Sequence, residues 1–161
     1  MESVLKRFIS YKELGEKTFD QLSEIDFHYT ANEASNSIAH IIQHMHGNML
    51  SRWTNFLTED GEKSWRARDE EFENQNYSKG KLIELWKEGW DCMFKALKSL
   101  KEEDLTKTVY IRTQPLAAVD AINWQLAHYS YHIGQIVFIA KILRNQEWKT
   151  LTIPKRPATK H

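Results

Sequence analysis

The feature that most constrains the fold is the span 121–140, which contains no Lys, Arg, Asp or Glu. A span with helical apolar periodicity and no charge is typical of a helix that is buried nearly all round. Gly and Pro, which interrupt helices, number only six and three in the whole chain. Their scarcity favours long helices over many short strands. The sequence therefore predicts an all-α protein built around this segment.

Four segments have the apolar spacing of helices. They cover about 3–22, from an Asn36-Ser37 cap to about 57, from a Ser78 cap to about 100, and from just after Pro115 to about 144. The polar segment 58–77 is far longer than the roughly two to eight residues that join antiparallel helices. A crossover of that length lets the second and third helices run parallel. We therefore predict a four-helix bundle of up-down-down-up topology.

The remaining segments are short. Residues 106–112 include a β-like run, Val109-Tyr110-Ile111, which forms either a small hairpin or an extended linker. Residues 150–161 contain Pro154 and Pro157 and predict an extended tail. A chain of 161 residues suits one hydrophobic core. We expect a single domain over 1–161, with 150–161 as its tail.

Composition narrows the classes of partner. Lys plus Arg and Asp plus Glu both number 22, so no net field favours nucleic acid or an anionic membrane. No apolar run reaches the roughly 20 residues that a membrane span needs. The single cysteine, Cys92, forms no CxxC pair, and the N-terminus has no signal-peptide apolar region. We expect a cytoplasmic protein that acts on a small molecule and binds neither nucleic acid nor membrane.

Two histidines, His128 and His132, interrupt the charge-free span. Residues four apart lie on one face of a helix, one turn above the other, so their imidazoles can chelate a single metal ion. In the alternative, each histidine only forms a hydrogen bond inside the core, because a buried imidazole needs a partner. The pair is a candidate for two ligands of a metal site.

The second helix offers three more histidines, and a stripe along it selects one. His44 lies in a polar but uncharged stripe made of Ser37, His44, Asn48, Ser51 and Asn55. A solvent-facing stripe normally includes Lys or Glu, so this one is typical of a helix that lines a polar cavity. His40 lies further toward the outside, and His46 lies at the opposite edge of the apolar stripe. The stripe could instead be a second packing face of small polar residues.

Three neutral imidazoles, from His44, His128 and His132, would leave coordination positions open on a divalent transition metal. Open positions are typical of a catalytic site rather than a closed structural one. Imidazole suits zinc, nickel, copper and iron, so these ligands do not select the metal.

These segments resemble a known family. The sequence from His128 to Gln135, HYSYHIGQ, resembles the HxxxHxGQ signature in the last helix of the DinB superfamily, also called DinB/YfiT-like metalloenzymes. The segment 36–48, NSIAHIIQHMHGN, is similar to its second-helix motif, whose metal ligand falls on His44. The segment 61–72, GEKSWRARDEEF, and LTIP at 151–154 resemble one branch known only as a domain of unknown function. The resemblance spans essentially the whole chain.

The resemblance implies an up-down-down-up bundle with a three-histidine site for zinc or nickel, often in a homodimer. Relatives in that superfamily include transferases and isomerases that use low-molecular-weight thiols such as bacillithiol or mycothiol. We therefore expect a metal-dependent S-transferase with such a thiol as co-substrate. The alternatives are a hydrolase that uses metal-bound water, and a non-catalytic, metal-binding dimer.

Four further residues are candidates near the site. Gln135 and Asn48 lie one turn from a predicted ligand, where each could orient a histidine or bond another helix. Arg66 and Arg68 lie in the crossover, and their guanidinium groups suit carboxylates of a substrate or thiol. In the alternative, these arginines form a salt-bridge network that orders the long loop.

Overall fold

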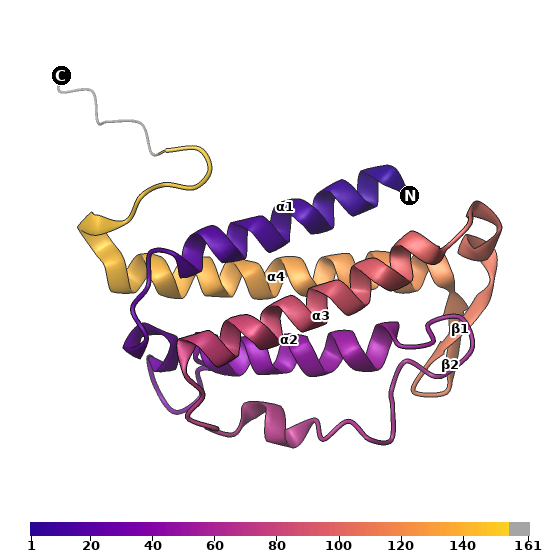
Figure 1. Ribbon diagram of the computed structural model, residues 1–161, viewed down its shortest axis with the longest axis horizontal. Coiled ribbons are helices and arrows are strands. Elements are labelled where there is room, and N and C mark those ends of the chain that lie inside the picture. Colours follow the sequence, from indigo (N-terminus) through magenta and orange to yellow (C-terminus); the bar gives the residue numbers. More distant parts are fainter. Residues whose placement is uncertain (155–161) are drawn as a thin grey trace.

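Four long helices lie side by side in the computed structural model, which describes residues 1–154 (Figure 1). They are α1 (Glu2–Phe19), α2 (Ile38–Trp53), α3 (Lys79–Ser99) and α4 (Ala118–Arg144). A two-stranded hairpin of β1 (Thr108–Ile111) and β2 (Gln114–Ala117) precedes α4. The all-α prediction is confirmed, and the small hairpin is its one addition among the described residues. Most of the predicted tail, 155–161, lies outside the described residues.

The directions of the helices follow from the colours along the chain in Figure 1. α1 and α4 run one way and pack against each other, and α2 and α3 run the opposite way and also pack together. The crossover between α2 and α3 returns along the bundle and includes a short 3-10 turn, Asp69–Phe72, that contacts α2. This arrangement is the up-down-down-up order expected from the length of the crossover.

Local capping explains where the helices begin. The Ser37 side chain accepts a hydrogen bond from the backbone N–H of His40 at 3.1 Å, and His40 Nδ1 accepts one from Ser37 N–H at 3.3 Å. Ser78 accepts from the N–H of Lys81 at 3.2 Å. Each bond satisfies a backbone donor that the first helical turn leaves free. Both predicted caps are confirmed, and the His40 side chain takes part in the cap at Ser37.

The helix ends differ from the sequence prediction. α1 ends at Phe19 rather than about 22. α2 ends at Trp53 rather than about 57, because Asn55 adopts a φ of 51°. A left-handed residue just past a helix stops it, and Asn tolerates that conformation better than most residues. This end removes Asn55 from the predicted uncharged stripe of α2.

The segment that the sequence left open between hairpin and linker is a hairpin. Its turn consists of Arg112 and Thr113, which have φ angles of 52° and 64°. Two-residue turns of this kind need positive φ and usually contain Asn or Gly. Here the Asp60 carboxylate accepts hydrogen bonds from both turn N–H groups, at 2.9 and 2.7 Å. The crossover thus fixes the tip of the hairpin.

The expectation that α4 is buried nearly all round is wrong. Tyr129 and Ile133 are fully buried on its inner face, but Trp124, Tyr131 and Phe138 on its outer face are 58%, 53% and 65% exposed. Its neighbours cover one side of the helix only, so an uncharged apolar stripe remains on the outside. Within residues 1–154, no helix is long and apolar enough to cross a membrane.

Candidate metal centre

Three histidines from two helices converge in the bundle. His44 lies on α2, and His128 and His132 lie on α4. The Nε2 atom of His128 is 3.2 Å from Nε2 of His44 and 3.1 Å from Nε2 of His132. One ligand atom from each residue lies within 4.8 Å of the other two. The structure therefore brings together all three residues that the sequence singled out.

An acceptor oxygen fixes the other nitrogen of each ring. The Nδ1 contacts are His44 to Glu71 Oε2 at 3.0 Å, His128 to Gln125 Oε1 at 3.3 Å, and His132 to Gln135 Oε1 at 2.8 Å. A carboxylate or amide oxygen only accepts, so each Nδ1 carries the hydrogen. Each Nε2 then presents a lone pair to the others. Such partners are how proteins orient metal-binding histidines.

This donor set fits a divalent cation. The Nε2 lone pair of His128 faces those of His44 and His132 at 3.2 and 3.1 Å, and such lone pairs repel one another unless a positive charge lies between them. Two imidazole nitrogens bound to a tetrahedral zinc at about 2.0–2.1 Å lie about 3.4 Å apart, close to these separations. His44, His128 and His132 are the residues that would hold the ion, although metal binding itself stays a prediction.

Burial keeps two of the ligands unprotonated. Burial, together with the neighbouring His132 and His44, lowers the pKa of His128 to about 3. Burial and His44 likewise lower the pKa of His132 to about 4. Because only a neutral imidazole can bind a metal ion, both side chains are ready ligands at neutral pH.

The crossover supplies the support for His44. Glu71 bonds His44 through Oε2, and Arg66 binds the same carboxylate through Nε at 2.7 Å and Nη2 at 2.8 Å. Although burial raises the pKa of Glu71, Arg66 and His44 bring it below its ordinary value. Phe72 stacks on the His44 ring with centroids 5.0 Å apart. Arg66 is thus a member of a salt-bridge network that orders the loop, the alternative considered from the sequence.

A cavity of about 470 Å³ opens beside the histidines. His44 and His128 contribute to its wall, and the hairpin closes it on the other side, so a small molecule can approach the cluster there. Arg68 also lines it, with a side chain that is 52% exposed.

Comparison with known proteins gives the family. Residues 1–157 match the model of the family described as "Protein of unknown function (DUF1572)". The chain belongs to this family. The fold is similar to the crystal structure of a DinB-like protein, YjoA, from Bacillus subtilis, with a TM-score of 0.68. The two share 15% sequence identity, and the match covers 94% of this chain and 96% of the other.

The family match confirms the resemblance to a branch known only as a domain of unknown function, and the structural match shows that its fold is DinB-like. At 15% identity the structural likeness concerns the fold alone. Among curated proteins, none matches the sequence. The activity within this DUF1572 domain must therefore be argued from its own residues.

Of the remaining sequence candidates, Gln135 lies against a ligand and Asn48 does not. Asn48 lines the cavity, but its Oδ1 accepts a hydrogen bond from the Tyr129 hydroxyl at 3.0 Å. That hydroxyl in turn accepts one from Trp53 Nε1 at 2.9 Å. This buried chain of three residues ties α2 to α4 directly beneath the cavity. Asn48 therefore helps to position the two helices.

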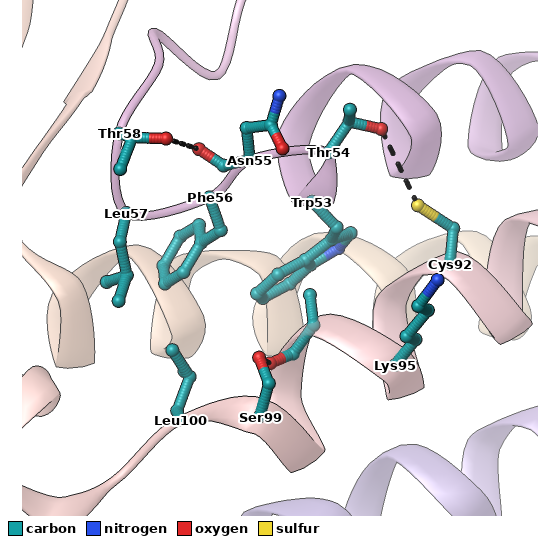
Figure 2. Close-up of a pocket in the computed structure, with 11 residues that line it drawn as sticks. Trp53, Thr54, Asn55, Phe56, Leu57, Thr58, Cys92, Lys95, Ser99 and Leu100 are labelled. Atoms are coloured by element: carbon teal, nitrogen blue, oxygen red, sulfur yellow. Dashed lines mark hydrogen bonds between the residues drawn. The ribbon is translucent and has the colours of Figure 1, made fainter.

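A second groove lies elsewhere, between the end of α2 and α3 (Figure 2). It measures about 460 Å³ and shares no lining residue with the cavity beside the histidines. Cys92 lies at one side of it, with Sγ 3.8 Å from Thr54 Oγ1. No histidine or carboxylate lines this groove within the described part of the chain, so the metal chemistry belongs to the other cavity.

Sequence reasoning missed Glu71, Gln125 and Arg52, which also lines the cavity. Gln125 had a local signal, since it precedes His128 by three residues just as Gln135 follows His132 by three. Glu71 lies in the family-like segment 61–72, but nothing local there marks it as a partner of His44, because the two residues meet only through the folded crossover. Arg52 is on α2, and nothing in its neighbours in the sequence marks it.

Proposed function

We propose that this DUF1572 domain is a metal-dependent S-transferase that joins a low-molecular-weight thiol, of the bacillithiol type, to an electrophilic small molecule. The observation that carries the proposal is the convergence of three Nε2 lone pairs whose rings are fixed through Nδ1. The resemblance of its motifs to the DinB superfamily supports it, since thiol-dependent transferases occur among the proteins that the sequence resembles.

The chemistry needs a group that lowers the pKa of a thiol. A divalent ion such as zinc or nickel, when bound, lowers the pKa of a coordinated thiol and so supplies a thiolate at neutral pH. His44, His128 and His132 would hold the ion, and Glu71, Gln125 and Gln135 orient the rings through their Nδ1 atoms. The cavity admits both reactants on the side of His44 and His128.

The proposed reaction is a substitution in which the thiol sulfur displaces a leaving group from carbon. The sulfur of the thiol forms a bond to an electrophilic carbon, and the leaving group departs with the electron pair of the bond that breaks. The thiol proton passes to solvent. The apolar part of the cavity wall, which includes Leu116 and Trp124, restricts the water around the reacting carbon.

The first test measures metal and turnover together. Purified wild type is expected to hold about one divalent ion per chain and to accelerate conjugation of a thiol with chlorobimane, which releases chloride. The variants His128→Ala and His132→Ala should lose both. His46→Ala is the matched control, because His46 lies on α2 but pairs with Glu88 outside the cluster.

The outcomes separate the alternatives. Wild type without stoichiometric metal overturns the metal site. Turnover of an ester or amide probe without added thiol would show that the protein is a hydrolase rather than a transferase. Stoichiometric metal with no turnover of either probe leaves a metal-binding protein without catalysis.

A further inference from the structure

The charged side chains that line the cavity beside the histidines are all cationic, although the chain as a whole has no net charge. Within residues 1–154, its wall contains no Asp, Glu or Lys, and its charged members are four arginines: Arg52, Arg66, Arg68 and Arg112. Clefts lined by one sign of charge concentrate ligands of the opposite sign. The wall therefore favours an anionic ligand, and a bound cation would add to that preference.

The four arginines are not equally available. Arg66 donates two hydrogen bonds to the Glu71 carboxylate, and Arg68 is an exposed side chain near Asp69. Arg52 and Arg112, by contrast, form ion pairs with Glu62, which also pairs with Arg66, and the Asp60 carboxylate lies near both of them. Glu71 holds Arg66 through two short bonds, whereas Arg52 and Arg112 share a single carboxylate as their ion-pair partner. Arg52 and Arg112 are therefore the arginines of the wall with the weaker side-chain pairing.

Arg52 is the least satisfied of them. Its side chain is 7% exposed, and its ion pair with Glu62 is long, with Nη2 3.6 Å from Oε2. In the part of the chain that the structure describes, its Nε and Nη1 atoms have no hydrogen-bond partner. Buried donors on a charged group are costly to leave unpaired, so the hydrogen-bonding capacity of Arg52 is not used up by its neighbours in the fold.

The crossover and the hairpin pack closely around the Arg52 side chain. A Cβ atom on Gly61 would lie 2.8 Å from its Cδ and 2.9 Å from its Nη1, so only glycine leaves room for this side chain. The backbone N–H of Gly61 bonds Tyr110 O at 2.8 Å, which ties the same residue to the hairpin. Crossover and hairpin thus form a close-fitting pocket around Arg52.

Arg112 reaches the cavity from a strained turn. A φ of 52° is unfavourable for a residue with a long side chain, and the Asp60 carboxylate holds this turn in place. Strain of this kind is found where a side chain must be placed for a ligand. The hairpin therefore contributes Arg112 to the wall of the cavity that His44 and His128 also line.

We infer that Arg52 and Arg112 form a subsite for an oxyanion, a carboxylate or phosphate group, of the molecule that enters the cavity beside the three histidines. Guanidinium groups bind such oxyanions through paired, charge-assisted hydrogen bonds. Pro115, Leu116 and Trp124 supply the apolar wall for the rest of the ligand. The inference rests on the proposed function only in assigning that ligand as a reactant.

A test without metal isolates the subsite. Phenylphosphonate combines an aromatic ring with an oxyanion, and benzamide is its uncharged counterpart. Calorimetry on chelator-treated protein should show that phenylphosphonate binds at least about tenfold more tightly than benzamide. Arg52→Gln and Arg112→Gln should each remove that preference. Because Arg112 is mostly exposed, its substitution tests the subsite even if the Arg52 variant fails to fold.

A test with metal asks whether the oxyanion belongs to a reactant. In cobalt-loaded protein, the sulfur-to-cobalt absorption band reports thiol binding. Mercaptoacetate, 3-mercaptopropionate and 4-mercaptobutyrate are compared with their amides. At least one acid should bind about tenfold more tightly than its amide in wild type but not in Arg112→Gln. Arg7→Gln on exposed α1 removes the same charge far from the cavity and should keep the preference.

The outcomes of these two tests distinguish failure of the subsite from failure of the proposed transferase function. Equal binding of phenylphosphonate and benzamide, or a preference that survives in both arginine variants, overturns the subsite. Selective phenylphosphonate binding in a protein without thiol transfer keeps the subsite and rejects the transferase. Thiol transfer that is indifferent to the carboxylate rejects the subsite and keeps the transferase.

Discussion

The Glu71 carboxylate accepts the Nδ1 hydrogen of His44 at 3.0 Å while Arg66 holds both of its oxygens. This relationship connects the crossover to the candidate metal centre, because it decides which nitrogen of His44 faces the other two rings. It also explains why the long crossover is ordered. Breaking it should therefore affect metal affinity before it affects the fold of the bundle.

The first prediction concerns the charge of Glu71. Glu71→Gln should lower metal affinity by about 10- to 100-fold, because the His44 ring loses its anionic acceptor. Competition with a chelating indicator measures this change. Glu88→Gln is the matched control, since Glu88 bonds His46 at 3.0 Å on the exposed side of α2. Unchanged affinity in Glu71→Gln, or an equal loss in Glu88→Gln, would contradict the role of Glu71.

The second prediction concerns the buried chain from Trp53 through Tyr129 to Asn48. Tyr129→Phe removes the hydroxyl and leaves a buried donor and a buried acceptor unpaired, at a cost of about 1–3 kcal/mol in the free energy of unfolding. Urea unfolding measures the loss, while metal content should stay at the wild-type value. Tyr110→Phe, at a half-exposed hydroxyl, should change neither. A Tyr129→Phe variant as stable as wild type would show that the chain contributes little.

The third prediction concerns pH in the metal-free protein. The pKa values of His128 and His132 are lowered to about 3 and about 4 in the fold, against 6.5 ordinarily. Between pH 6.5 and 4 the unfolded chain therefore binds more protons than the folded one, so stability falls as the pH falls. The slope is at most about 1.4 kcal/mol per pH unit for each proton.

Unfolding by urea at pH 7 and pH 5, in chelator, measures this difference. The double variant His128→Asn/His132→Asn lacks both groups and should lose less stability over the same interval. His46→Asn should lose as much as wild type. A metal-free wild type that is equally stable at both pH values would be inconsistent with neutral buried ligands.

The features that could be predicted are those that depend on nearby residues in the sequence. The i, i+4 spacing of His128 and His132 and the caps at Ser37 and Ser78 act within one helical turn. The length of the crossover was enough to favour the observed helix directions. His44 could be distinguished from His40 and His46 because its uncharged stripe and the family motif both lie within a single helix.

The features that escaped prediction depend on the folded crossover. Glu71 and Arg52 acquire their surroundings only when the crossover and the hairpin pack against α2, so no local pattern marks them. The burial of α4 was overestimated for a different reason. An uncharged helix face looks the same in sequence whether it packs inside one chain or against another molecule, as Phe138 illustrates.

The sequence also led us to expect a homodimer, and the outer face of α4 is the surface on which we place its interface. Trp124, Tyr131 and Phe138 recur every seven residues along it and are all more than half exposed. Gly134 lies among them, and a Cβ atom there would meet no heavy atom within 4 Å. A glycine inside a helix costs about 1 kcal/mol relative to alanine, and within the described chain nothing requires it. We expect a second copy to pack closely at this point.

The fourth prediction tests that expectation. Two copies of an uncharged apolar face can meet across a two-fold axis without like-charge repulsion and bury Trp124, Tyr131 and Phe138, so wild type should sediment as a dimer. Phe138→Lys should give a folded monomer, because the lysine is free in solvent but unpaired in an apolar interface. Gly134→Ala discriminates further. It should stabilise a monomer by up to about 1 kcal/mol through helix propensity, yet weaken a dimer whose helices meet there. A wild type that sediments as a monomer, with Gly134→Ala merely more stable, would rule out self-association through α4.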